Sequence, residues 1–174
     1  MTDRATGAWR VGQGFDVHRF SHDAGRPLVL GGVVVDGEGA RGLDGHSDAD
    51  ALAHAVADAV LGGAGLGDLG GVAPDSDPRW KDADSLRILA EVVSRARSAG
   101  WRPVNADCTV VAERPQLAQF VGEMAGRLGA ILGAPVNVKA TTAEGMGALG
   151  RVEGVACMAV VLLACTDEPH AGEA

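Results

Sequence analysis

Imidazole and carboxylate side chains recur at short spacings in two segments near the start of the chain. Asp16 and His18 lie two residues apart in an alternating apolar segment, so a β-strand would place both on one face. His54 lies in a segment with apolar residues at helical spacing. Two histidines and one carboxylate are a common catalytic zinc set, because three protein ligands leave the fourth tetrahedral position open. The alternative is a solvent-exposed pair at a strand end and an incidental histidine.

The segment around His54 contains a second pattern. His46, Asp50, His54 and Asp58 recur every four residues and would form one ridge of a helix. Ser47 is predicted as the N-cap, with Asp50 as the acidic partner of a capping box. A helix N-terminus attracts anions, so a metal ligand beside it would suit a phosphate group. An exposed acidic face is the alternative.

Two hydroxyls and a carboxylate follow a strand-like segment at Thr141, Thr142 and Glu144. Hydroxyls can donate hydrogen bonds to phosphate oxygens, and a carboxylate can hold a Mg²⁺ ion that bridges phosphates. Taken alone, these residues would also suit a strand followed by a turn.

A long loop carries three acidic residues, Asp68, Asp75 and Asp77. Its length without a periodic pattern predicts a lid or binding loop that contacts sugar hydroxyls or a cation. Polar turn residues without a ligand are the alternative. Arg151 is a candidate contact for an anion, with an ordinary surface charge as the alternative.

The composition predicts one globular domain with an aliphatic core. The chain has 174 residues, only 3% aromatic residues and no tyrosine. Its net charge is -8, and the only lysines are Lys81 and Lys139. The absence of a basic run argues against nucleic-acid binding. An acidic protein that binds an anionic substrate needs local cations, such as a metal, a helix N-terminus or a few placed arginines.

Three cysteines, Cys108, Cys157 and Cys165, fall in apolar strand-like runs without a CxxC pair. This pattern predicts reduced core thiols and a cytoplasmic location. The first ten residues lack an apolar signal region, and no stretch approaches ~20 apolar residues, so we expect no membrane span.

The order of predicted elements favours an α+β fold, with a mixed sheet covered by helices on one face. Strands are predicted at 9–17, 28–30, 33–35, 101–112, 136–142 and 152–164, and helices at 47–61, 82–99 and 115–128. The last strand is apolar throughout, which indicates burial on both faces or at a subunit interface. We expect a flexible leader at 1–8, one domain at 9–165 and a disordered tail at 166–174.

Six motifs, in order and at matching spacing, resemble the 2-C-methyl-D-erythritol 2,4-cyclodiphosphate synthase family, over about Val11 to Leu163. The motifs are Gly14-Phe15-Asp16-Val17-His18, His46-Ser47-Asp48-x-Asp50 with His54, Gly67-Asp68-x-Gly70, Pro74-Asp75-Ser76-Asp77-Pro78, Ala83-Asp84-Ser85, and Val136-Asn137-Val138-Lys139-Ala140-Thr141-Thr142-x-Glu144.

The resemblance implies a phosphorus–oxygen lyase of the non-mevalonate isoprenoid pathway. In this family the 2-phosphate of 4-diphosphocytidyl-2-C-methyl-D-erythritol 2-phosphate attacks the β-phosphorus, giving the cyclic diphosphate and CMP. It also implies a homotrimer with a four-stranded sheet packed around the trimer axis and active sites between neighbouring chains.

The resemblance also assigns roles to residues. Asp16, His18 and His54 match the Zn²⁺ ligands, and Glu144 matches a ligand of a second ion, Mg²⁺ or Mn²⁺. His46 and Thr142 match residues that stabilise the transition state. The substrate-binding residues that it implies are Ser47, Asp68, Gly70 and Asp75 near the erythritol phosphate, Ala112, Gln116, Leu117, Ala140 and Thr141 near the cytidine, and also Leu69, Asp77 and Arg151.

Three positions depart from the family pattern. Lysine is usual at Gln116, phenylalanine at Ala148 and glutamate at Met158. The last two departures predict weak or altered binding of an isoprenoid diphosphate in the central cavity of a trimer. A zinc-dependent phosphohydrolase that uses a metal-bound hydroxide, and a trimeric nucleotide-binding module without turnover, are the alternative functions.

Overall fold

Four strands form one mixed sheet in the computed structural model, which describes residues 8–74 and 76–166. They lie in the order β1-β6-β4-β5. The pairs β1–β6 and β6–β4 are antiparallel and the pair β4–β5 is parallel, which confirms the predicted mixed sheet. The bounds are β1 (Trp9–Arg19), β4 (Trp101–Val111), β5 (Val136–Thr141) and β6 (Gly154–Cys165).

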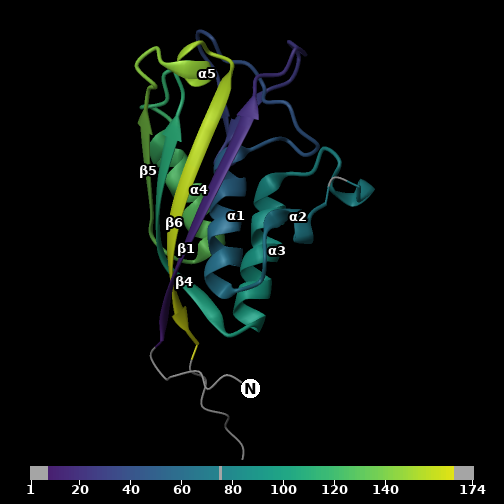
Figure 1. Cartoon of the computed structure of the whole chain (residues 1–174), viewed down its shortest axis with the longest axis vertical. Helices are drawn as coiled ribbons and strands as arrows, with labels where there is room; N and C mark the ends of the chain where they lie inside the picture. Colours follow the sequence, from purple (N-terminus) through teal and green to yellow (C-terminus); the bar gives the residue numbers. More distant parts are fainter. Residues whose placement is uncertain (1–7, 75, 167–174) are drawn as a thin grey trace, which may run out of the picture.

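Three helices cover one face of this sheet (Figure 1). They are α1 (Ala51–Ala64), α3 (Ser85–Ser98) and α4 (Val121–Leu132). A separate hairpin consists of β2 (Leu28–Leu30) and β3 (Val33–Val35), which confirms the strands predicted at 28–30 and 33–35. Short helical turns lie in the segments between the longer elements, namely α2 (Leu69–Val72), a 3-10 turn (Pro78–Trp80) and α5 (Gly147–Gly150).

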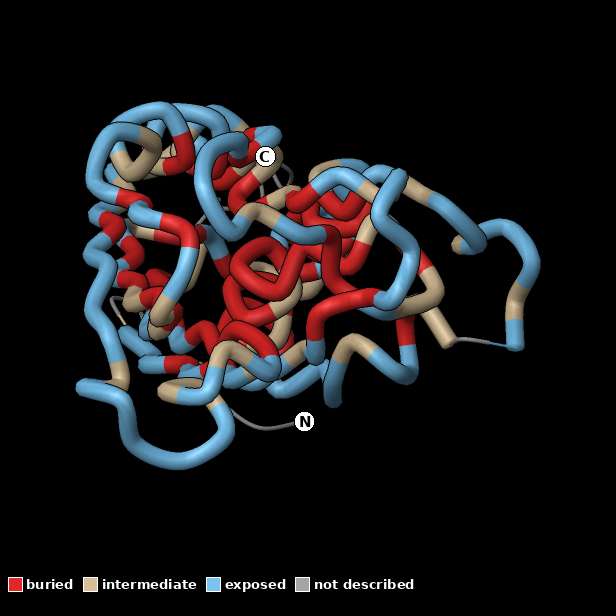
Figure 2. The backbone as a smooth tube through the Cα atoms, turned by 90° about the horizontal axis from the view of Figure 1, so that it is seen from above, coloured by how far each residue is buried: buried red, intermediate tan, exposed pale blue. Residues whose placement is uncertain are grey.

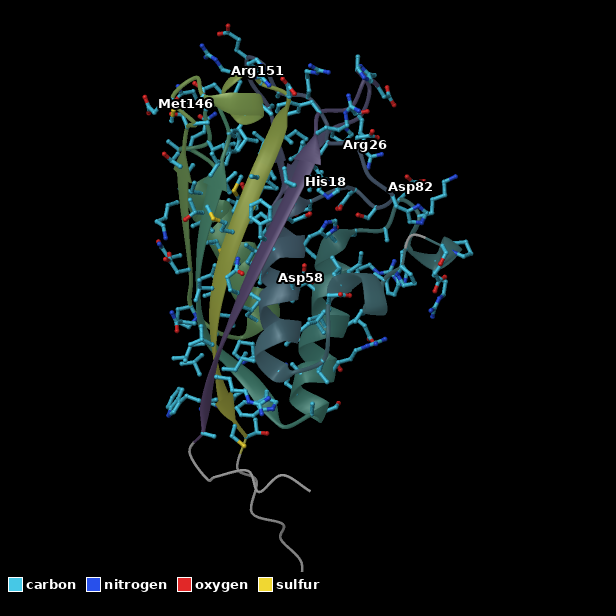
Figure 3. The ribbon with its side chains drawn as sticks, in the orientation of Figure 1. His18, Arg26, Asp58, Asp82, Met146 and Arg151 are labelled. Atoms are coloured by element: carbon cyan, nitrogen blue, oxygen red, sulfur yellow. The ribbon has the colours of Figure 1, made fainter. Side chains whose placement is uncertain are left out.

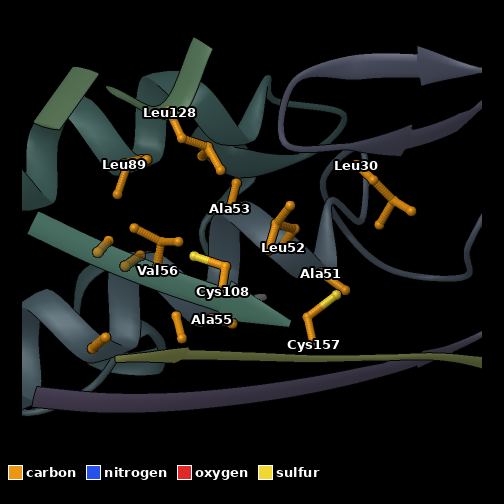
Figure 4. Packing of buried hydrophobic residues seen from close by; sticks show 14 of the residues in the cluster. Leu30, Ala51, Leu52, Ala53, Ala55, Val56, Leu89, Cys108, Leu128 and Cys157 are labelled. Atoms are coloured by element: carbon orange, nitrogen blue, oxygen red, sulfur yellow. The ribbon is translucent and has the colours of Figure 1, made fainter. Parts of the chain in front are cut away.

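Helix α1 packs against β1, β6 and α3, whereas α4 packs against β5. Buried backbone, drawn in red, is concentrated in the interior of the molecule (Figure 2). Figure 4 shows Val56 of α1 between Cys108 of the sheet and Leu89 of α3. Five alanines in the first three turns of α1 are at most 1% exposed, namely Ala51, Ala53, Ala55, Ala57 and Ala59. These small side chains allow the helix to pack closely on several neighbours at once.

Helix α1 packs closely against β1 at two glycines of the strand, which have no side chain to separate the two backbones. A Cβ atom on Gly12 would lie 1.8 Å from the carbonyl oxygen of Ala59, and one on Gly14 would lie 1.9 Å from that of Ala55. Because strand side chains alternate, the face that carries these glycines also carries Asp16 and His18. The glycines therefore bring the two predicted ligands against the start of α1.

Several predicted helix boundaries were wrong. Helix α1 begins after Asp50, not at Ser47, because Asp50 is the N-cap and its carboxylate accepts from the backbone N–H groups of Leu52 and Ala53. It continues beyond the predicted end at residue 61 to Ala64. Gly65, which has a left-handed φ of 73°, is the C-cap that ends it. The later helices begin at Ser85 and Val121, after the predicted starts at 82 and 115.

The second face of the sheet carries apolar side chains that the described chain leaves exposed. Val11, Phe15 and Val17 of β1 are 67%, 53% and 54% exposed, and Met158 and Val160 of β6 are 40% and 46% exposed. The final strand is therefore not buried on both faces within one chain, and only the subunit-interface alternative stays open. A patch of this kind indicates a protein interface.

The three cysteines are free thiols on β4 and β6. Burial raises the pKa of Cys108 to about 12 and that of Cys157 well above its ordinary value. Among the described residues, none of the helices combines the length and apolarity that a membrane crossing requires. The predicted leader and tail fall largely on residues 1–7 and 167–174, outside the described residues.

Candidate metal centre and substrate cavities

Asp16, His18 and His54 meet where β1 passes the first turn of α1. The Oδ2 atom of Asp16 lies 3.0 Å from Nε2 of His18 and 3.0 Å from Nδ1 of His54. One ligand atom from each residue lies within 4.8 Å of the others. The structure therefore brings together the three residues that the sequence placed in two separate segments.

A hydrogen bond at Nδ1 leaves Nε2 of His18 as the nitrogen that can bind a metal. Its Nδ1 atom lies 2.6 Å from the carbonyl oxygen of Asp44, which can only accept, so Nδ1 carries the hydrogen. In a neutral imidazole, Nε2 is then unprotonated and faces Asp16. This donor set, two imidazoles and one carboxylate, fits a divalent transition metal such as zinc.

The charges at this site reinforce one another in the metal-free protein. Burial opposes the ionisation of Asp16, but hydrogen bonds and charge interactions with His18 and His54 outweigh it and hold the pKa of Asp16 well below its ordinary value. Burial likewise opposes protonation of His18, but the hydrogen bond and charge of Asp16 outweigh it, so the pKa of His18 is raised. The carboxylate is thus ionised and ready to attract a cation.

The three residues lie at the edge of a cavity of about 260 Å³. Of the predicted residues, His46, Ser47, Leu69 and Gly70 also line this cavity. In the described structure, Nε2 of His46 is buried and has no hydrogen-bond partner. A buried polar atom without a partner is unfavourable unless a ligand or water satisfies it, so His46 is suited to contact a bound molecule.

An arginine holds the loop that carries His46 and Ser47. The guanidinium of Arg26 donates to the carbonyl oxygens of Gly45, at 3.2 Å, and of Ser47. The segment before α3 adds a further constraint, since the N–H of Asp82 donates to the carbonyl oxygen of His46 at 2.9 Å. Figure 3 shows Arg26 near His18, at the end of β1.

The predicted ridge of four acidic and imidazole side chains on one helix face is correct for His54 and Asp58 and wrong for His46 and Asp50. His54 and Asp58 both line the cavity, but His46 precedes α1 and Asp50 faces the core with 0% exposure. Asp50 also accepts from the N–H groups of Gly31 and Gly32, at 2.8 and 2.6 Å. It therefore joins the β2–β3 turn to the start of α1 and does not face the metal ligands.

A second, smaller cavity of about 120 Å³ lies between the end of β4 and the end of β5. It brings together the predicted residues Ala112, Gln116, Leu117, Ala140, Thr141 and Thr142. The hydroxyl of Thr142 donates to Oε1 of Glu144 at 2.9 Å, which places that carboxylate next to the cavity. The two cavities share no lining residue among those described.

The remaining predicted residues lie outside the described linings of both cavities. Asp68 is the N-cap of α2 and accepts from the N–H of Gly71 at 3.0 Å, which positions Leu69 and Gly70. Asp77 pairs with Arg79 at 2.6 Å, and the exposed Arg151 pairs with Glu153 at 2.7 Å near α5 (Figure 3). Asp75 lies outside the described residues.

Five further residues line the first cavity and were not among the site residues predicted from the sequence. They are Gly45, Asp58, Ala73, Trp80 and Ile88. Asp58 accepts from the N–H of Leu69 at 2.7 Å, and burial raises its pKa. Its position four residues after His54 was a usable signal, whereas nothing local marks Trp80 or Ile88.

Comparisons with known proteins agree on one family. The profile of the YgbB family matches residues 9–164. The 2-C-methyl-D-erythritol 2,4-cyclodiphosphate synthase of Geobacillus kaustophilus is 55% identical over 158 residues, which cover 89% of this chain and 98% of that protein.

Two solved structures share the fold. The bifunctional IspDF of Campylobacter jejuni is 40% identical with a TM-score of 0.85, covering 92% of this chain and 43% of that one. A CDP-bound 2C-methyl-D-erythritol-2,4-cyclodiphosphate synthase is 34% identical with a TM-score of 0.78, and the match covers 88% of this chain and 99% of that one.

Proposed function

The chain belongs to the YgbB family, and we propose that it converts 4-diphosphocytidyl-2-C-methyl-D-erythritol 2-phosphate to 2-C-methyl-D-erythritol 2,4-cyclodiphosphate and CMP. It is a lyase of the non-mevalonate isoprenoid pathway. The observation that carries this proposal is the meeting of Asp16, His18 and His54 at one edge of a cavity. Phosphoryl transfer of this kind depends mainly on positioning and charge neutralisation.

Asp16, His18 and His54 would hold a zinc ion through Oδ2, Nε2 and Nδ1. When bound, zinc would supply Lewis-acid polarisation of a phosphate oxygen. His46 would contact the phosphate that undergoes attack, because its unpartnered Nε2 is buried beside the same cavity. The nucleophile is the substrate's own 2-phosphate, so the protein needs no activated serine or cysteine.

The second cavity would take the cytidine, and Glu144 would hold a Mg²⁺ or Mn²⁺ ion beside it. One carboxylate suits Mg²⁺, which is commonly bound by one or two carboxylates together with substrate phosphates. When bound, this ion would supply positive charge to the departing CMP phosphate. Thr142, already within hydrogen-bond distance of Glu144, would orient both the carboxylate and the nucleotide.

The assembled enzyme would be a homotrimer, with the apolar sheet face of each chain packed around the axis. This arrangement would cover the side chains of β1 and β6 that a single chain exposes. It would also join the first cavity of one chain to the second cavity of its neighbour. We also place the enzyme in the cytoplasm, where its three free thiols would stay reduced.

Analysis of the products tests the reaction. With the substrate, zinc and Mg²⁺, ³¹P NMR should show the cyclic diphosphate and chromatography an equal amount of CMP, with no turnover after the metals are chelated. A linear, hydrolysed phosphate would instead indicate the phosphohydrolase. Binding of CDP without any product over a long incubation would indicate a nucleotide-binding module.

Replacing Val160 by aspartate should dissociate the trimer, because the change puts a charge in the centre of an apolar interface. Light scattering should give three times the 17.6 kDa chain mass for the wild type and one chain mass for the variant. The variant should also release little CMP, since the nucleotide cavity of the neighbour would be lost. The control is Val34→Asp, at an exposed valine of the β2–β3 hairpin, which should remain trimeric. A monomeric wild type, or a trimeric Val160→Asp variant, would contradict the predicted assembly.

A further inference from the structure

The imidazole of His54 makes a second hydrogen bond through the ring nitrogen that does not face Asp16. Its Nε2 atom lies 2.8 Å from the hydroxyl of Ser85 and further, 3.3 Å, from that of Ser47. The Ser85 hydroxyl in turn lies 2.5 Å from Oδ1 of Asp48. A continuous series of hydrogen bonds thus runs from Asp48 through Ser85 to the metal-facing imidazole.

The chemistry of the carboxylate fixes the direction of these hydrogen bonds. An ionised carboxylate only accepts, so the single hydrogen of the Ser85 hydroxyl is donated to Asp48. The Ser85 oxygen is then the acceptor for His54, whose Nε2 must carry the hydrogen. Because Ser85 keeps a hydrogen on Nε2, Nδ1, the atom 3.0 Å from Asp16, is the nitrogen that offers its lone pair when a cation replaces the hydrogen shared with that carboxylate.

The surroundings keep this geometry in place. Ser85 is the first residue of α3 and only 1% exposed, so water has little access to replace it. Its backbone N–H donates to the other oxygen of Asp48, at 3.1 Å. The N–H of Asp48 donates to the carbonyl oxygen of Ala83, also at 3.1 Å. The start of α3 and the loop before α1 therefore hold each other.

We propose that Asp48 and Ser85 are positioning residues that fix the tautomer of His54 and so prepare its Nδ1 atom for a divalent metal. Neither residue belongs to the group of metal-ligating side chains. The inference rests on the metal site of the proposed function and adds to it the groups that set its affinity. Hydrogen-bond partners of a metal-bound histidine orient the ring and raise its basicity, and their loss typically weakens metal binding about 10- to 100-fold.

Zinc affinity, measured by competition with a chromophoric chelator, tests the proposal without reference to turnover. Ser85→Ala removes the acceptor for Nε2. Asp48→Asn leaves one acceptor oxygen for the two donors of Ser85, so the hydroxyl is released to donate to His54. Each variant should bind zinc about 10- to 100-fold more weakly than the wild type. The control is Asp84→Asn, at a neighbouring N-cap residue that contacts Leu86 and not His54, which should bind zinc like the wild type.

The tautomer itself is the second readout. In the zinc-loaded wild type, ¹⁵N NMR of the histidine rings should show His54 with its hydrogen on Nε2 and Nδ1 as the ligating nitrogen, and Asp48→Asn should weaken that preference. Wild-type zinc affinity in both variants, or a zinc-loaded wild type in which His54 carries its hydrogen on Nδ1, would overturn the proposal. A wild type that does not bind zinc would instead contradict the proposed metal site, while a hydrogen on Nε2 of His54 in that protein would still support the hydrogen bond to Ser85.

Discussion

Replacing His54 by alanine should lower kcat/KM for CMP release about a thousandfold or more. The change removes one of three metal ligands, and Lewis-acid catalysis contributes several kcal/mol of transition-state stabilisation, at about 1.4 kcal/mol per tenfold in rate. The variant should also lose zinc, as measured by elemental analysis after gel filtration. The fold should survive, because the side chain lies at a cavity edge and not within the core.

The matched control is His22→Ala. His22 is exposed in the turn after β1, away from the ligand group, so its removal should leave both the zinc content and the rate unchanged. Turnover at the wild-type rate by a zinc-free His54→Ala protein would rule out the metal-assisted mechanism.

Replacing Gly14 by alanine should lower the free energy of unfolding by about 3 kcal/mol or more, at the upper end for overpacked sites. The new Cβ would lie 1.9 Å from the carbonyl oxygen of Ala55 and 2.7 Å from the backbone nitrogen of Ala59. Because both atoms belong to the backbone of α1, the strand and the helix would have to separate. Urea denaturation measures the stability, and zinc affinity should fall as well, since Asp16 would move away from His54.

Gly126→Ala is the control for a glycine replacement that meets no obstacle. Gly126 lies within α4, where an added Cβ has no atom within 4 Å. This variant should be more stable than the wild type by about 0.5–1 kcal/mol, because alanine restricts the unfolded chain and favours the helix. An unchanged urea midpoint for Gly14→Ala would show that β1 and α1 are not packed as closely as the structure indicates.

Alternation and apolar runs were sufficient to predict the strands of the sheet and the shared face of Asp16 and His18. Both properties depend on neighbouring residues in the sequence, because side chains alternate along a strand and residues two apart must share a face. The convergence of these residues with His54 depends on the packing of β1 against α1. Local patterns do not encode that packing, so residue types made these three a candidate zinc set, and the resemblance to a known family was needed to predict that they converge.

The start of α1 shows why local rules misplaced a site residue. Ser47 and Asp50 fit a capping box, but Asp50 is itself the cap, and two further N–H donors come from the β2–β3 turn. Those donors are about twenty residues away in sequence. The contact of Ser85 with Asp48, over 37 residues, was equally hidden. Long-range hydrogen bonds of buried polar groups are therefore the part of this site that sequence periodicity leaves undetermined.

The burial of two of the three thiols makes the chain convenient for site-selective labelling. Alkylating reagents attack the thiolate, and the interior positions of Cys108 and Cys157 suppress that form. Cys165 is half-buried at the far end of β6, paired in register with Trp101, whereas the metal ligand His18 pairs with the opposite end of the strand. A fluorophore on Cys165 would thus report from a point remote from the reacting phosphates.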